Sequence, residues 1–91
     1  MPRPFKRRNI LGSPSATYFK PAGIRMIDLQ ESILKIDEFE AIRLKDYLQL
    51  DQHECAKKMN ISQPTFHRLL LNARKKLSDA IINGKAIKII R

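Results

Sequence analysis

The chain has 91 residues, with 18 lysines and arginines against 9 aspartates and glutamates, a net charge of +9 and a pI near 10.1. This length fits one small domain, and no apolar run approaches the roughly 18 residues that span a bilayer. The basic start lacks an apolar stretch of signal-peptide length and Cys55 is the single cysteine, so we expect a cytoplasmic protein without an internal disulfide.

Residues 1–23 are predicted to form a basic N-terminal arm without regular structure, followed by a helix-turn-helix domain at residues 24–91. The arm holds four of the five prolines, two of the three glycines and no acid. Its segment PRPFKRR could lie in a narrow minor groove or touch phosphates without sequence preference. The adjacent aromatics Tyr18 and Phe19 predict a point where the arm docks onto the domain.

The segment that follows the arm predicts a short helix starting near Asp28 and an extended stretch at Ile33–Ile36. A longer scaffold helix is then expected, because Asp37 and Glu40 have capping-box spacing and EFEAIRLKDYLQL is rich in helix formers. We expect the acids of this helix to be explained by capping and solvation. Its apolar residues cover more than one side, as in a helix packed against two neighbours: Phe39, Ala41, Ile42, Leu44, Tyr47 and Leu48.

The stretch after position 50 predicts two helices joined by a tight turn. Asp51 caps the first helix, Asn60 ends it in a left-handed conformation, and Ser62 caps the second. Ala56 is small enough to let two steeply crossing helices approach closely. The second helix is predicted to span residues 63–82, with one apolar stripe formed by Phe66, Leu69, Leu70, Ala73, Leu77, Ala80 and Ile81.

The end of the chain predicts a helix stop and a short strand. Asn83 and Gly84 end the long helix, and Lys85–Arg91 alternates in part as a strand does. That strand could pair with Ile33–Ile36, with another subunit or with nothing. The expected fold is therefore mainly α, a helix-turn-helix bundle of three to four helices with an irregular arm.

No enzymatic activity, cofactor or metal site is expected. His53 and Cys55 are two positions apart on a helix and so point in different directions, and Cys55 lies on the apolar side as a buried thiol would. The sequence contains no recognisable pairing of a nucleophile with a base, no paired carboxylates in a pocket and no glycine-rich phosphate loop.

The charge distribution and the outer side of the second helix predict DNA binding. Residues 1–25 carry a net +6, residues 26–62 a net −3 and residues 63–91 a net +6, which suits a polyanion on one side. Side chains near the start of a recognition helix enter the major groove deepest, so the predicted base contacts are Gln63, Thr65, His67 and Arg68. Contacts to phosphates or the adjoining minor groove are predicted for Ser62, Asn72, Lys75, Lys76, Arg3, Lys6, Arg7 and Arg8.

Four sequence blocks resemble a family of small, uncharacterised prokaryotic proteins that are predicted to bind DNA. The blocks are YFKPAGI at 18–24, DEFEAIRL at 37–44, AxxMxISQPTFxR at 56–68 and ARKKLSDAIINGKAIKI at 73–89. The resemblance covers nearly the whole chain and implies a helix-turn-helix similar to region 4 of sigma-70 factors. Family members often carry cysteines in the arm, whereas residues 7–13 contain none here.

The interpretation is a sequence-specific DNA-binding transcriptional regulator, and several alternatives stay open. The basic surface also suits an RNA-binding or RNA-polymerase-associated module, or an adaptor that meets an acidic protein. A solvated hairpin in a small bundle would share the helical pattern, and a membrane surface would attract the same charge. A homodimer is expected because one recognition helix covers few base pairs, with Leu71 and the apolar C-terminal run as candidate contacts.

Overall fold

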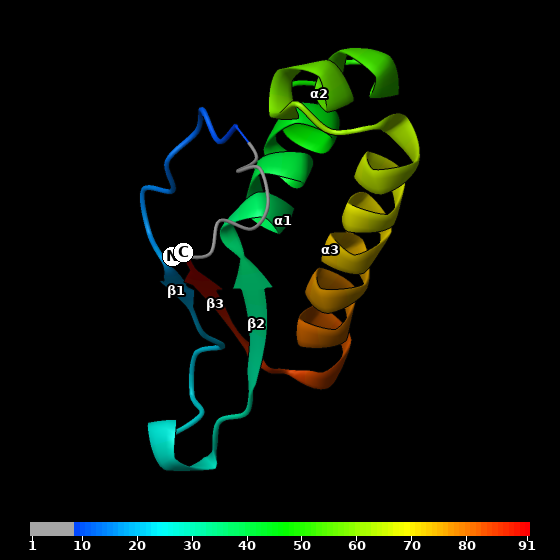
Figure 1. The fold of residues 1–91 in the computed structure, drawn as a ribbon. Coiled ribbons are helices and arrows are strands. Elements are labelled where there is room, and N and C mark those ends of the chain that lie inside the picture. The colour runs from blue at the N-terminus through cyan, green and yellow to red at the C-terminus, as the bar shows by residue number, and fades with distance from the viewer. Residues whose placement is uncertain (1–8) are drawn as a thin grey trace, which may run out of the picture.

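The computed structural model describes residues 9–91 and shows three helices and one small sheet, with two of the helices packed against the sheet and the third packed against helical neighbours (Figure 1). The strands are β1 (Tyr18–Phe19), β2 (Glu31–Lys35) and β3 (Ala86–Ile90), and the helices are α1 (Ile36–Ile42), α2 (Gln52–Met59) and α3 (Gln63–Asn83). A 3-10 turn, η1 (Met26–Asp28), precedes β2, and a π-helical turn, η2 (Arg43–Tyr47), extends α1. The short helix expected to start near Asp28 therefore ends there instead.

The sheet has the order β1-β3-β2, so the last strand of the chain lies in its centre. Strands β2 and β3 are parallel, with Leu34 opposite Ile89, and β1 runs antiparallel to β3, with Phe19 opposite Ile87. Parallel neighbours require a long crossover, and here that crossover contains α1, α2 and α3. The predicted C-terminal strand is confirmed. Of the partners left open for it, the strand pairs with the stretch predicted at residues 33–36, which is extended over Glu31–Lys35, while Ile36 begins α1. The expectation of a mainly α bundle with one short C-terminal strand was incomplete, because that strand belongs to a three-stranded sheet and the fold is mixed α/β.

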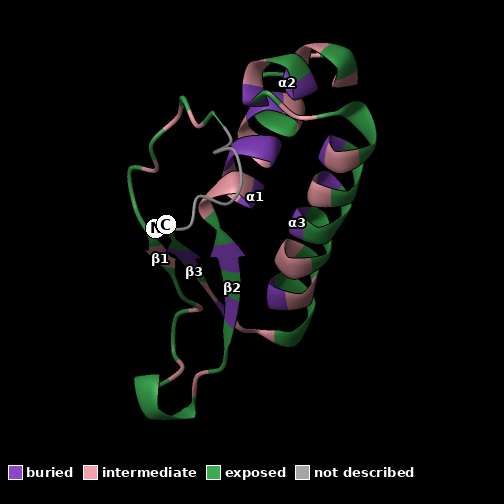
Figure 2. Ribbon diagram, in the orientation of Figure 1, coloured by how far each residue is buried: buried purple, intermediate pink, exposed green. Residues whose placement is uncertain are grey.

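Two groups of buried side chains hold the layers together. The first joins the three helices and consists of Ala41, Leu44, Cys55, Ala56, Met59, Phe66 and Leu70. The second joins α3 to the sheet through Leu34, Ala73 and Ile89. Figure 2 shows the buried residues of α3 on the side that faces α1 and the sheet, while its outer side is exposed. The predicted apolar stripe is thereby confirmed for most of its length.

Three residues assigned to apolar packing surfaces are exposed instead. Tyr47 is 79% exposed and Leu48 45%, because the π-helical turn that ends at Tyr47 adds an extra residue and rotates these side chains away from the α-helical register. Ile81 is 76% exposed. At this point of α3 the small side chain of Ala80 carries the contact with the interior, so the stripe is narrower than predicted.

Two acids of α1 that were expected to be solvated are buried. Glu40 is fully buried, and its carboxylate accepts hydrogen bonds from Arg43 Nε at 2.8 Å and Nη2 at 3.0 Å. Glu38 accepts the backbone N–H of Lys35 at 2.9 Å and so caps α1, which places the helix start two residues earlier than the predicted Asp37–Glu40 box. A carboxylate enters the interior here because cationic and amide donors replace its water.

The described part of the N-terminal arm, residues 9–23, is packed onto the domain. The amides of Leu11 and Gly12 donate to Glu40 at 3.1 and 3.2 Å, and the amide of Asn9 donates to the carbonyl of Met59 at 3.1 Å. Burial alone would raise the pKa of Glu40, yet the bonds from Arg43 and the two amides lower it. The docking predicted at Tyr18 and Phe19 is confirmed, but these residues form strand β1, so the expectation of an arm without regular structure was wrong there, because the pair bonds to β3.

Candidate nucleic-acid interface

Residues 51–83 form two helices joined by a turn, as the sequence predicts. Asp51 Oδ1 accepts the backbone N–H of Glu54 at 2.8 Å and caps α2. Asn60 has φ 58° and ψ 46°, the left-handed conformation that ends this helix. Ser62 Oγ accepts the backbone N–H of Thr65 at 3.2 Å and caps α3. The two caps and the left-handed residue define where α2 stops and α3 starts.

The inner side of α3 is anchored by the core. Phe66 is fully buried and Leu70 is 2% exposed, and both belong to the cluster that contains Ala56 and Cys55 of α2. Burial raises the pKa of the Cys55 thiol, and the thiol donates to the carbonyl of Leu50 at 3.6 Å. Cys55 is therefore a protonated packing residue, and α3 cannot rotate without disrupting these contacts.

The outer side of α3 carries an exposed strip that runs from near the helix start to just past its middle. Arg68, Leu71, Asn72 and Lys75 follow the spacing i, i+3, i+4 and i+7, which places them on one face of the helix, and all four are exposed. Arg68 Nη2 donates to Thr65 Oγ1 at 3.4 Å. We call these four residues the outer strip.

The first turn of α3 adds further polar groups next to the outer strip. Ser62, Gln63 and His67 are exposed, whereas Thr65 is half-buried. Ser62 Oγ donates to Thr65 Oγ1 at 2.9 Å, so the Thr65 hydroxyl lies between Ser62 and Arg68. In this arrangement Thr65 orients its neighbours, while Gln63 and His67 face solvent.

Two basic residues of α3 are engaged by acids on other elements. Lys76, which was predicted to contact phosphate or the minor groove, lies on the flank that faces α1, and its Nζ is 2.7 Å from Glu38 Oε1. Arg74 contacts Asp46 of η2 at 2.6 Å, and its hydrogen bond lowers the pKa of that aspartate. Within residues 9–91, Arg68 and Lys75 form no ion pair.

Two residues of α2 reach the start of α3, and sequence reasoning missed them. Gln63 Nε2 lies 3.1 Å from His53 Nδ1, and Gln52 Nε2 donates to the carbonyl of Gln63 at 3.4 Å. His53 was weighed only as a metal ligand beside Cys55. Its place in the first turn of α2, the turn that packs near the start of α3 in a hairpin of this kind, was the signal available in the sequence.

Three further points concern the basic residues of the arm, metal binding and membrane spans. Arg3, Lys6, Arg7 and Arg8 lie outside the described residues. Among residues 9–91, no three His, Cys, Asp or Glu side chains are grouped so that they could hold a metal ion. None of the helices described here combines the length and the apolar character that crossing a membrane requires.

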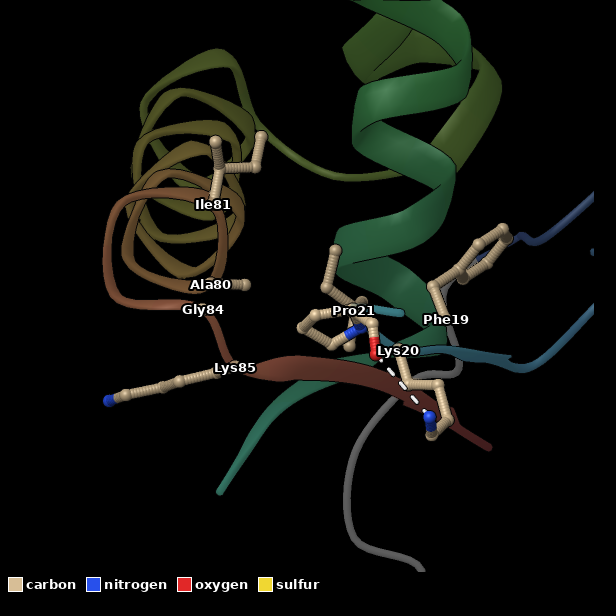
Figure 3. Close-up of a pocket in the computed structure, with 8 residues that line it drawn as sticks. Phe19, Lys20, Pro21, Ala80, Ile81, Gly84 and Lys85 are labelled. Atoms are coloured by element: carbon tan, nitrogen blue, oxygen red, sulfur yellow. Dashed lines mark hydrogen bonds between the residues drawn. The ribbon is translucent and has the colours of Figure 1, made fainter. Parts of the chain in front are cut away.

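A hollow at the opposite end of α3 is mainly apolar. Figure 3 shows its lining, which consists of Phe19, Lys20, Pro21, Ala80, Ile81, Gly84, Lys85 and Ile87. Its two lysines are occupied, since Lys20 Nζ donates to the carbonyl of Pro21 at 3.3 Å and Lys85 Nζ contacts Asp79 at 2.8 Å. This hollow brings together no set of groups for acid–base or nucleophilic chemistry.

Comparison with known proteins places the chain in a family without assigning it a function. The family model described as "Protein of unknown function DUF134" matches residues 1–91. A UPF0251 protein of Caldanaerobacter subterraneus subsp. tengcongensis is 53% identical over 89 residues, which cover 98% of this chain and 75% of that protein. UPF0251 proteins of Dehalococcoides mccartyi and Moorella thermoacetica are 53% and 49% identical over 98% of this chain, and over 76% and 60% of their own lengths. No solved structure matches the chain. The chain therefore belongs to the DUF134 family, whose relatives are named UPF0251 proteins.

Proposed function

We propose that this protein is a transcriptional regulator that binds double-stranded DNA and reads its sequence with the N-terminal half of α3. The observation that carries the proposal is the outer strip, which is exposed on a helix whose opposite side is held by Phe66 and Leu70. Its basic residues Arg68 and Lys75 form no ion pair in the described part of the chain, although the charge of Lys75 helps to lower the pKa of Asp79 one turn further along the helix.

The dimensions and chemistry of α3 suit the major groove. An α-helix with side chains is about 10–12 Å wide, close to the roughly 12 Å width of that groove. Gln63, His67 and Arg68 lie near the helix start, where side chains reach base edges, and amide or guanidinium groups match adenine or guanine. Asn72 and Lys75, further along, are placed to contact phosphates.

Selection of bound sequences from a random duplex pool tests the proposal directly. Enrichment of a defined motif is the expected result, and an inverted repeat would indicate a twofold dimer. We also propose a dimer, because one helix contacts few base pairs. Sedimentation at micromolar concentration checks the oligomeric state independently. Absence of enrichment, or tighter binding to structured RNA than to duplex DNA at equal salt, would contradict DNA reading.

Arg68→Ala separates base reading from general attraction. We expect a loss of roughly 1–3 kcal/mol on the selected site and a relaxed preference at one position, because a specific base contact is removed. Lys88→Ala is a matched control, because it removes one exposed basic side chain elsewhere on the domain. The strand neighbours of Lys88, Ile87 and Ile89, face the helices, so Lys88 points to the opposite side of the sheet. Equal losses on selected and random duplexes would remove Arg68 from the base contacts.

Lys75→Ala tests the phosphate contact. Binding to all duplexes should weaken, and the slope of log K against log salt should flatten by about 0.9, the value for one phosphate contact. The Lys88→Ala protein should keep the slope of the unmodified protein. An unchanged slope in Lys75→Ala would place this lysine outside the interface.

A further inference from the structure

The contact between the first turns of α2 and α3 orients a side chain on the proposed reading surface. Gln63 is the first residue of α3 and is exposed, and its Nε2 lies 3.1 Å from Nδ1 of His53, the second residue of α2. Gln52, the first residue of α2, holds the Gln63 carbonyl at 3.4 Å. Both contacts link groups on the surface of the domain, where packing does not dictate the position of the Gln63 amide.

The chemistry of this contact leaves one donor and one acceptor on Gln63. A glutamine amide carries two N–H groups and a carbonyl oxygen. When neutral His53 carries its proton on Nε2, Nδ1 accepts one of the two N–H groups. The second N–H and Oε1 then remain for a ligand. With this tautomer a reversed amide would place Oε1 opposite a nitrogen without a hydrogen, so a ring protonated on Nε2 favours one of the two amide orientations, whereas a ring protonated on Nδ1 would favour the other.

We propose that His53 is a positioning residue that orients Gln63 to read an adenine. Adenine presents one acceptor, N7, and one donor, N6, in the major groove, which matches the N–H and Oε1 left on Gln63. Guanine presents two acceptors and would need both N–H groups. The inference rests on the proposed DNA binding and deepens it, because it names the base and a residue that sets the preference without touching DNA.

An alternative role for the contact between His53 and Gln63 is purely structural, namely to hold α2 against α3. The positioning role and the structural role predict different measurements. A fastening contact would affect stability and binding to every duplex alike. A positioning contact changes the ratio of affinities for duplexes that differ at one base pair. An amide that is already oriented before binding loses less conformational entropy when it binds. This raises the affinity only for the base that fits that orientation.

The experiment measures that ratio in a double-mutant cycle. For each position of the selected site, four duplexes are prepared that differ only in the base pair at that position. Each duplex is titrated with the unmodified protein, His53→Ala, Gln63→Ala and the double variant. The unmodified protein should prefer adenine at one position by about 5- to 150-fold, the range for a bidentate base contact. Gln63→Ala should abolish this preference, and His53→Ala should reduce it by about 2- to 12-fold, the equivalent of one hydrogen bond. The double variant should match Gln63→Ala.

A conservative variant and a measurement without DNA complete the test. His53→Asp places an oxygen that only accepts near the position of Nδ1, so it should keep more of the adenine preference than His53→Ala while its negative charge weakens binding to all four duplexes. In the free protein, nitrogen NMR should find the neutral His53 ring protonated on Nε2, and Gln63→Ala should perturb the Nδ1 resonance.

The outcomes distinguish this inference from the proposed function. If the unmodified protein selects no duplex sequence, DNA reading fails and the adenine assignment fails with it. If it selects a sequence but His53→Ala lowers all four affinities equally, the contact only fastens the helices and the inference is overturned while DNA reading stands. A preference for guanine at the position that responds to Gln63→Ala would overturn the adenine assignment.

Discussion

Replacing Glu40 by Gln removes the charge from the centre of a buried network without changing the size of the side chain. The two carboxylate oxygens of Glu40 accept four hydrogen bonds, two from Arg43 and one each from the amides of Leu11 and Gly12, at 2.8–3.2 Å. A glutamine has one carbonyl oxygen, and its NH₂ group would face donors that it cannot satisfy. Several of the four donors therefore lose their partner.

The expected loss of stability follows from burial. Breaking a buried ion pair by neutralising one partner typically costs about 3–5 kcal/mol. The Glu40 side chain is fully buried whereas that of Arg43 is 26% exposed, so water reaches the guanidinium and the lower end applies. We expect a decrease of about 3 kcal/mol in the free energy of unfolding, equivalent to a fall in Tm of roughly 12–24 °C for a domain of this size.

Urea denaturation at neutral pH measures this decrease, and hydrogen exchange locates it. The amides of Leu11 and Gly12 should lose more protection than the core of α3. The double variant Glu40→Gln with Arg43→Leu is the control, because it leaves no unpaired guanidinium and should lose less than the sum of the two single changes. A loss below about 1 kcal/mol, with protection at Leu11 and Gly12 unchanged, would refute the view that this carboxylate holds the arm.

Three further predictions concern the same arm and the turn between α2 and α3. Gly12→Ala should cost about 1–3 kcal/mol in urea denaturation, because a Cβ there would overlap the Arg43 side chain; additivity with Arg43→Ala would contradict this cause. Asn60→Ala should cost about 1–2 kcal/mol while Asn60→Gly should be nearly neutral, since φ is 58°; equal losses would exclude backbone strain. The folded-state pKa of Glu40 is lowered, so its stabilisation is complete above about pH 5 and is lost as the pH falls toward that lowered value, and this part of the pH dependence should be absent from Glu40→Gln.

Much of the fold could be predicted because its signals are local. Helix caps, helix stops and apolar spacing depend on residues three or four positions apart, and the sequence placed the ends of α2 and α3 correctly at Asp51, Asn60, Ser62 and Gly84. The exposed residues Gln63, His67, Arg68, Asn72 and Lys75 followed from the same periodicity, since whatever does not belong to the apolar stripe must lie outside it.

The acids of α1 show what local reasoning could not reach. Glu40 was expected in solvent because carboxylates are rarely buried, yet its partners include amides 28 and 29 residues away. Lys76 was assigned to the outer side of α3, but its partner Glu38 lies 38 residues earlier in the chain. Neither pairing leaves a periodic trace in the sequence.

The sequence by itself determined where the helices of the hairpin begin and end and which side of α3 is apolar, because caps and periodicity are interactions within one or two turns. Tertiary structure alone decided that β3 lies between β1 and β2 and that Glu40 anchors the arm. These outcomes depend on which surfaces meet when distant segments pack, and the free energy of each contact exists only after that packing has occurred.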